Sequence, residues 1–149
     1  MEIDPSAQAV LALTREGFQH ERDGDIPGAT VLYEQAVAIA EGDHAQCVAA
    51  HFMARHRTDP AEELSWNLRA LELARRVGDD RVIEYFASFN GCVGHSYERL
   101  GEPERARPYL EEGLRRLADV IPGDGYRDDV EQDIRETLKR VSASPGVQD

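Results

Sequence analysis

The chain is poor in the residues that hold small proteins together covalently or through metal ions. Of its 149 residues only two are cysteines, Cys47 and Cys92, and they lie in separate apolar stretches. A disulfide framework is therefore excluded as the basis of the fold, and we expect both thiols to be reduced and buried. A single domain of this length can instead bury a sufficient apolar core.

Positive charge and long hydrophobic runs are also scarce. Acidic residues number 29 and basic residues 17, which gives a net charge of −12 and disfavours nucleic acid or an anionic membrane as partner. No run approaches the roughly 20 apolar residues of a membrane span, and the first residues lack a signal-peptide pattern. We therefore expect a cytoplasmic protein. Lys139 is the only lysine, so arginine dominates, which is typical of a GC-rich bacterial genome.

Strand-like alternation is absent as well, whereas helix signals recur throughout the chain. Asp-Pro pairs and Gly-containing breaks separate stretches of apolar residues at helical spacing, which predicts an all-α protein. We predict one domain over residues 1–141, with helical hairpins at about 5–41, 43–77 and 80–119, a capping helix at about 124–141, and a disordered tail at 142–149. The fifth helix is expected to be the longest, beginning near residue 80.

A repeated pattern is the most informative feature that the sequence does contain. The pattern of residues 28–40 returns about 34 residues later, around residues 65–74, and a third copy spans residues 101–117. Repetition at this period is typical of stacked helical hairpins, each of which completes the core of its neighbour. Such arrays more often bind partners than catalyse reactions.

The residues at the predicted helix crossings resemble those of the tetratricopeptide repeat family. Gly17, Ala29, Tyr33 and Ala36 match the family's small and aromatic positions in the first copy. In the third copy the matching positions are Gly94, Tyr97, Ala106, Leu110 and Gly113. Gly94 is thereby expected to lie where two helices cross, opposite Ala106.

The resemblance covers residues 5–119, with a degenerate second copy in which His51 and Glu63 replace the expected Gly and Ala. It implies a right-handed superhelix of antiparallel hairpins with about seven helices. It also implies that the first helix of each hairpin lines a concave groove. The residues placed there by register are Thr14, Phe18, Arg22, Val48, Phe52, Arg55, His56, Gly91, His95 and Arg99.

This lining suggests what the groove would bind. Chaperone-docking members of the family hold a terminal carboxylate with Lys and Asn, and the corresponding positions here carry other residues. Arginines beside phenylalanines instead predict a protein or peptide segment with carboxylates and an apolar anchor, bound by a scaffold without catalytic activity. The alternative is that Phe18 and Phe52 belong to the core and that the arginines are only solvated.

Three further interpretations remain open. Cys47 with His51 and Cys92 with His95 share helix faces and could form a zinc set, although mid-helix thiols rarely do, so we expect no metal and no cofactor. His51 and His95 could instead form a small-molecule or catalytic pocket, but no known catalytic motif accompanies them. Finally, the outer face could mediate self-association.

Overall fold

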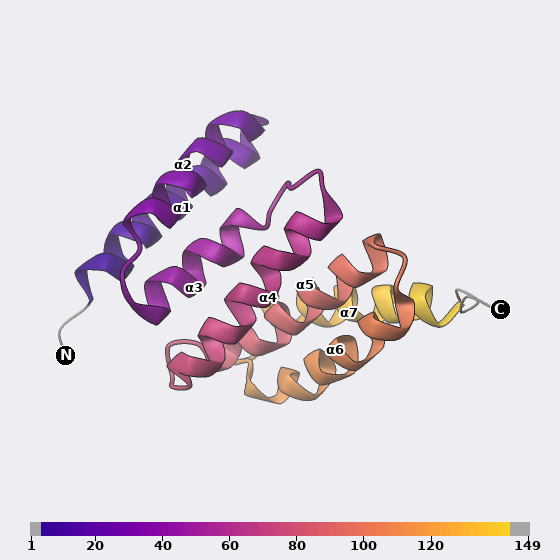
Figure 1. Ribbon diagram of the computed structural model, residues 1–149. Coiled ribbons are helices and arrows are strands. Elements are labelled where there is room, and N and C mark those ends of the chain that lie inside the picture. The colour runs from indigo at the N-terminus through magenta and orange to yellow at the C-terminus, as the bar shows by residue number, and fades with distance from the viewer. Residues whose placement is uncertain (1–3, 144–149) are drawn as a thin grey trace. The chain divides into compact units, whose positions relative to one another are not determined.

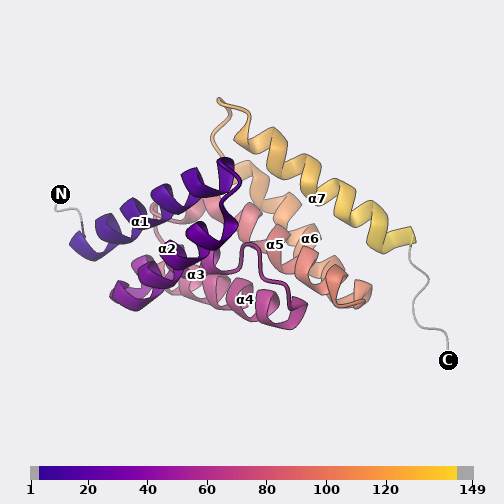
Figure 2. The same ribbon diagram turned by 90° about the horizontal axis from the view of Figure 1, so that it is seen from above.

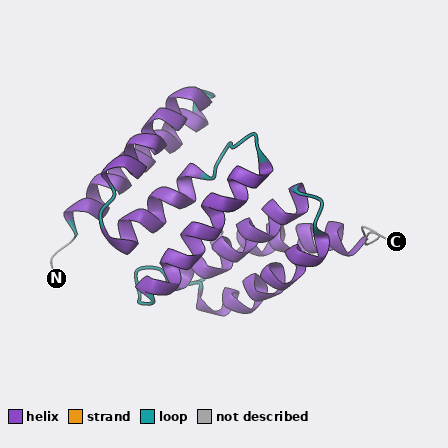
Figure 3. Ribbon diagram, in the orientation of Figure 1, coloured by secondary structure: helices purple, strands orange, loops and turns teal. Residues whose placement is uncertain are grey.

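The computed structural model describes residues 4–143, and within this range every regular element is a helix (Figures 1 and 3). The all-α prediction is therefore confirmed. Seven α-helices and two short 3-10 helices follow one another in the described range. They are α1 (Pro5–Arg22), α2 (Ile26–Ile39), α3 (Gly42–Met53), α4 (Pro60–Val77), η1 (Ile83–Tyr85), α5 (Phe86–Arg99), α6 (Pro103–Arg116), η2 (Leu117–Asp119) and α7 (Tyr126–Ala143).

The helices form two compact units, which we describe separately. The first unit ends at Val77 and the second begins at Gly78. In the first, α1 pairs with α2 and α3 pairs with α4, while α3 also packs on both α1 and α2. In the second, α5 pairs with α6, and α7 lies beside both of them (Figure 2).

Aspartate side chains start several helices, as the Asp-Pro signals predict. Asp4 Oδ1 accepts a hydrogen bond from the Ser6 amide at 3.0 Å, and Asp25 Oδ1 accepts one from the Gly28 amide at 2.9 Å. Asp59 Oδ1 accepts one from the Ala61 amide at 3.0 Å. Each carboxylate satisfies a backbone donor that has no partner within its own helix.

The first unit has an alanine-rich core at which its helices approach closely. Ala7, Val10 and Ala36 are buried together with alanines of α3. Gly17 of α1 lies directly beneath the ring of Tyr33, so a side chain at position 17 would collide with that ring. The absence of a Cβ at this position thus lets an aromatic residue of α2 become almost fully buried at the crossing.

The second unit repeats this arrangement with other residues. A Cβ at Gly94 of α5 would lie 2.5 Å from Leu110 Cγ and 3.3 Å from the Ala106 carbonyl oxygen of α6. The predicted position of Gly94 at the crossing, opposite Ala106, is confirmed. Leu110 is fully buried and forms a core with Ala106 and Ile134.

The prediction of a long fifth helix is wrong. α5 begins only at Phe86 and has 14 residues, fewer than the 18 of α1, α4 and α7. The residues between α4 and α5 form turns and η1 instead. Gly78, at φ +60°, follows the end of α4, and the Asp79 carboxylate accepts a hydrogen bond from the Arg81 amide at 3.0 Å. The late start of the third repeat is therefore caused by a connecting segment.

The final helix, α7, continues through Ala143, two residues beyond the predicted end. Its buried residues, Ile134, Thr137 and Val141, lie on one face, which packs on α5 and α6. The rest of the predicted tail, residues 144–149, lies outside the described residues. Among the helices that are described, none has the length and apolar character needed to cross a bilayer.

The close approach at Gly94 leads to a prediction about stability. We expect Gly94→Leu to destabilise the protein by about 1–3 kcal/mol, because the new side chain must displace Leu110 from a filled core. Helix propensity alone predicts the opposite sign, since leucine is favoured over glycine within a helix by nearly 1 kcal/mol. Urea denaturation followed by circular dichroism measures the difference.

A matched control is Gly123→Leu. Apart from its two chain neighbours, no residue comes within 4 Å of where a Cβ of residue 123 would lie, so this substitution is expected to change stability by less than about 0.5 kcal/mol. If Gly94→Leu proved as stable as the parent protein, the packing of α5 against α6 would have to be wrong.

Candidate functional site

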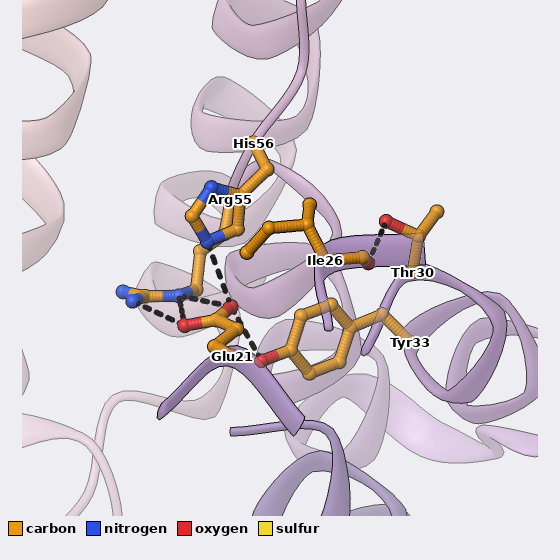
Figure 4. Close-up of polar contacts among 6 residues, drawn as sticks. All are labelled: Glu21, Ile26, Thr30, Tyr33, Arg55 and His56. Carbon is orange, nitrogen blue, oxygen red and sulfur yellow. Dashed lines mark hydrogen bonds and ion pairs between the residues drawn. The ribbon is translucent and has the colours of Figure 1, made fainter. Parts of the chain in front are cut away.

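A cluster of charged and polar side chains joins α1, α2 and the turn that follows α3 in the first unit (Figure 4). Its centre is the Glu21 carboxylate, whose side chain is only 7% exposed. Arg55 donates to it from Nε to Oε1 at 2.9 Å and from NH2 to Oε2 at 2.8 Å. The Tyr33 hydroxyl donates to Oε1 at 2.6 Å, and His56 Nε2 lies 3.1 Å from the same oxygen. We call these four residues the Glu21 cluster.

The hairpin repeat brings these residues together. Glu21 lies in the last turn of α1 and Arg55 just beyond α3, so one repeat period separates them along the chain. Tyr33 reaches Glu21 from α2 after crossing over Gly17. His56 has a φ of +60°, which is rare for a residue with a side chain. At this strained position its ring is placed against Glu21, within the same cluster.

The cluster changes the acidity of its members. Burial raises the pKa of Glu21, but hydrogen bonds from Arg55 and Tyr33, together with the positive charge of Arg55, outweigh burial and lower the pKa to about 2. Burial and the Glu21 charge both raise the pKa of Tyr33. The carboxylate is therefore ionised and the phenol neutral near neutral pH.

An aromatic and cationic surface adjoins the cluster. The Arg55 guanidinium carbon lies 5.6 Å from the ring centroid of Phe18, which is 42% exposed. Phe52 is half-buried and lies 5.3 Å from the ring of Tyr33. Arg22 is exposed in the last turn of α1. Of the predicted groove residues, those in the first unit thus include both exposed apolar and exposed cationic groups.

Thr14 does not belong to this surface. Its side chain is 1% exposed, and its hydroxyl donates to the Leu11 carbonyl oxygen at 3.2 Å. Leu11 is exposed instead, at 39%. The exposed residues Leu11, Arg15, Phe18 and Arg22 follow helical spacing along one face of α1, and we call them the α1 stripe. This helical spacing is visible in the sequence, but the register of the repeat family predicted Thr14 in the groove instead of Leu11 and Arg15.

Arg55 and Val48 also differ from a freely exposed lining. Arg55 is partly exposed, but its Nε and NH2 both donate to Glu21, so its charge is already paired within the cluster. Val48 is half-buried and packs against the core shared by α1, α2 and α3. Nothing in the sequence indicated that Arg55 pairs with Glu21, because helical periodicity does not show ion pairs between residues 34 positions apart.

In the second unit, the predicted groove residues have different surroundings. A Cβ at Gly91 would lie 2.9 Å from Ile134 Cγ1, so α7 covers the side of α5 on which a side chain at this position would lie, and Gly91 is only partly exposed. His95 and Arg99 are exposed. His95 Nδ1 lies 3.3 Å from Glu98 Oε1, and Glu98 in turn accepts a hydrogen bond from Arg140 of α7 at 2.7 Å.

The two cysteine–histidine pairs are divided between the units. Cys47 is buried, its thiol donates to the Ala70 carbonyl oxygen at 3.3 Å, and burial raises its pKa to about 12. Burial and the Arg55 charge lower the pKa of His51 to about 4. Cys92 and His95 belong to the second unit. Within residues 4–143, no three His, Cys, Asp or Glu side chains gather in a way that could hold a metal ion.

Comparison with known proteins supports the fold only. The N-terminal domain of stress-induced protein-1 (STI-1) from C. elegans matches with a TM-score of 0.62 at 16% identity, covering 91% of this chain and 98% of that one. The seven helices are consistent with three hairpin repeats and a capping helix. No protein-family model and no curated protein matches the sequence.

The Glu21 cluster predicts a pH-dependent stability. We expect Glu21→Gln to lower the free energy of unfolding at pH 7 by about 1–2 kcal/mol, a figure reduced because Arg55 is partly exposed. The folded-state pKa lies below the ordinary value of 4.5. The stabilisation is therefore complete above about pH 4.5 and is lost as the pH falls towards about 2, so the difference between the two proteins should narrow over that interval.

Urea denaturation at several pH values from 7 down to 3 tests this expectation. Glu16→Gln is the matched control, since Glu16 is an exposed glutamate on the same helix. A Glu21→Gln defect that stayed constant across this pH range, or one no larger than that of Glu16→Gln, would rule out the ionised carboxylate as the source of the stability.

Proposed function

We propose that the chain is a tetratricopeptide repeat protein that binds a peptide or protein segment and has no catalytic activity of its own. The similarity of its fold to a solved domain of the same helix arrangement supports the first part. The positions of Gly17, Tyr33, Gly94 and Leu110 at the helix crossings agree with the repeat pattern. The second part depends on the surface of the first unit.

The observation that carries the binding proposal is the α1 stripe. Leucine and phenylalanine alternate there with two arginines along one exposed face, in a chain whose net charge is −12. Such a surface attracts an acidic ligand locally and repels it elsewhere. The apolar members provide the area that an anchoring side chain would bury.

The Glu21 cluster contacts the α1 stripe through Arg55. Because Arg55 lies between Glu21 and Phe18, it holds the end of the stripe to α3 through one ion pair and one cation–π contact. Phe52, Arg55 and His56 then extend the proposed site from α1 towards α3, while His95 and Arg99 remain candidates in the second unit. The ligand we propose is an extended segment with carboxylate groups and at least one apolar anchor.

A set of synthetic peptides in solution gives a direct test of the ligand chemistry. Each peptide carries one leucine or phenylalanine among aspartates and is prepared with a free C-terminal carboxylate, with an amidated C-terminus, and with all aspartates replaced by asparagine. We expect the acidic peptides to bind at least tenfold more tightly than their asparagine counterparts, and raised salt to reduce the difference. Fluorescence anisotropy in solution supplies the dissociation constants.

A double variant tests the location. Arg15→Ala with Arg22→Ala is expected to weaken binding of the acidic peptides at least tenfold, while Arg55 stays intact so that Glu21 keeps its partner. The control, Arg75→Ala with Arg107→Ala, removes the same charge from exposed positions on α4 and α6. Equal effects of the two double variants, or equal affinity for acidic and neutral peptides, would contradict the proposed site.

A further inference from the structure

An open hollow of about 480 Å³ lies in the second unit. The hollow is formed where η1 faces the segment that connects η2 to α7. Eight residues line it, and they are mostly apolar or aromatic with two carboxylates among them. They are Glu84, Tyr85, Val120, Ile121, Pro122, Gly123, Asp124 and Tyr126.

Two tyrosine rings form a corner of this hollow. The ring centroids of Tyr85 and Tyr126 are 6.3 Å apart and their planes are inclined by 69°. Tyr126 is held in place because it packs on the small core of Ala87, Leu117 and Val120. Tyr85 is 41% exposed, and its ring is also 6.2 Å from that of Phe89. The aromatic corner thus has a fixed side and an accessible side.

The charge of the lining is entirely negative. Glu84 and Asp124 are its only carboxylates, and none of the eight lining residues is basic. Two arginines of the same unit pair with other residues. Arg116 lies over the Phe86 ring at 4.3 Å and pairs with Asp119 at 2.8 Å, while Arg81 pairs with Asp79 at 2.8 Å. The carboxylates of the hollow therefore have no basic counterpart in its lining.

Large apolar side chains are exposed to solvent in the segment between η2 and α7 that lines the hollow. Ile121 is 74% exposed, more than any other large apolar residue described, and Pro122 adjoins it. Burial, together with the negative charge of Glu84, raises the pKa of Tyr85, so its ring carries no charge near neutral pH. The hollow thus combines neutral aromatic rings, apolar surface and two carboxylates.

We propose that this hollow binds a small organic cation whose nitrogen carries methyl groups. An aromatic ring attracts a cation over its face, and the attraction is strongest for ions that are weakly hydrated. A quaternary methylammonium has no N–H group and therefore needs no hydrogen-bond acceptors around it, and its methyl groups bury against apolar side chains. Glu84 and Asp124 supply the opposite charge at the rim.

The probe for this proposal is choline, with 3,3-dimethylbutan-1-ol as a neutral control of the same shape. The two molecules differ by replacement of the charged nitrogen with carbon. Titration of the full-length, ¹⁵N-labelled protein is followed by NMR chemical shifts. We expect choline to shift the amides of residues 84–85, 120–121 and 123–126 and to bind at least fivefold more tightly than the alcohol. Equal binding of the alcohol would overturn the proposal.

Variants separate the contributions of ring and charge. Tyr85→Leu is expected to weaken choline binding at least fivefold, whereas Tyr85→Phe, which keeps the ring, should retain it. Glu84→Gln with Asp124→Asn should also weaken binding, and asparagine can still cap α7 in place of Asp124, whose carboxylate accepts a hydrogen bond from the Tyr126 amide at 3.1 Å.

The matched charge control is Glu16→Gln with Glu34→Gln, which removes two exposed carboxylates from the first unit. This control should leave choline binding unchanged. The proposed site would be contradicted if Tyr85→Leu left the affinity for choline unchanged. It would also be contradicted if both double variants weakened choline binding equally, because binding would then depend only on the net negative charge of the protein.

Discussion

The close approach of paired helices at small residues is the constraint on which the rest of each unit depends. In the first unit, Gly17 allows Tyr33 to lie across α1, and in the second, Gly94 allows Leu110 to lie against α5. Without a Cβ at these crossings the large partner residue is buried instead of displaced. The packing at these crossings buries one face of each helix, and the opposite face stays exposed to solvent.

The Glu21 cluster follows from that packing. Tyr33 reaches Glu21 only because its ring crosses α1 over Gly17, and the same carboxylate holds Arg55 from the next repeat. Removing Arg55 would leave the buried Glu21 carboxylate without its cationic partner, so substitution of this residue is expected to destabilise the first unit. Its position next to Phe18 means that a structural interaction and the proposed binding surface share one arginine.

The two proposed sites have opposite chemistry. The α1 stripe offers arginines beside apolar residues, whereas the hollow offers carboxylates beside tyrosines. Both depend on side chains that are exposed although large and apolar, among them Phe18 and Ile121. Single exposed apolar residues are common on any protein surface and indicate nothing by themselves. Exposed apolar residues that are grouped with charges of one sign are instead typical of a binding site.

Local patterns in the sequence determined the helices and their order. Apolar spacing, Asp-Pro starts and Gly-containing breaks act within a few residues, and for that reason α1 begins at Pro5 as predicted. The Gly94 crossing was predicted from the resemblance to the repeat family, and the contacts of Gly94 with α6 confirm it. The connection before α5 was missed because its apolar residues, such as Val82, fit a helix as well as a turn.

The candidate site was only partly predictable. Phe18 and Arg22 are exposed as expected, but the burial of Thr14 and the covering of Gly91 by α7 depend on neighbours that helical spacing alone does not specify. Tertiary structure alone decided the pairing of Glu21 with Arg55 and the formation of the hollow. The reason is physical: helix formation depends on local spacing, whereas ion pairs and cavities depend on distances between segments that only packing brings together.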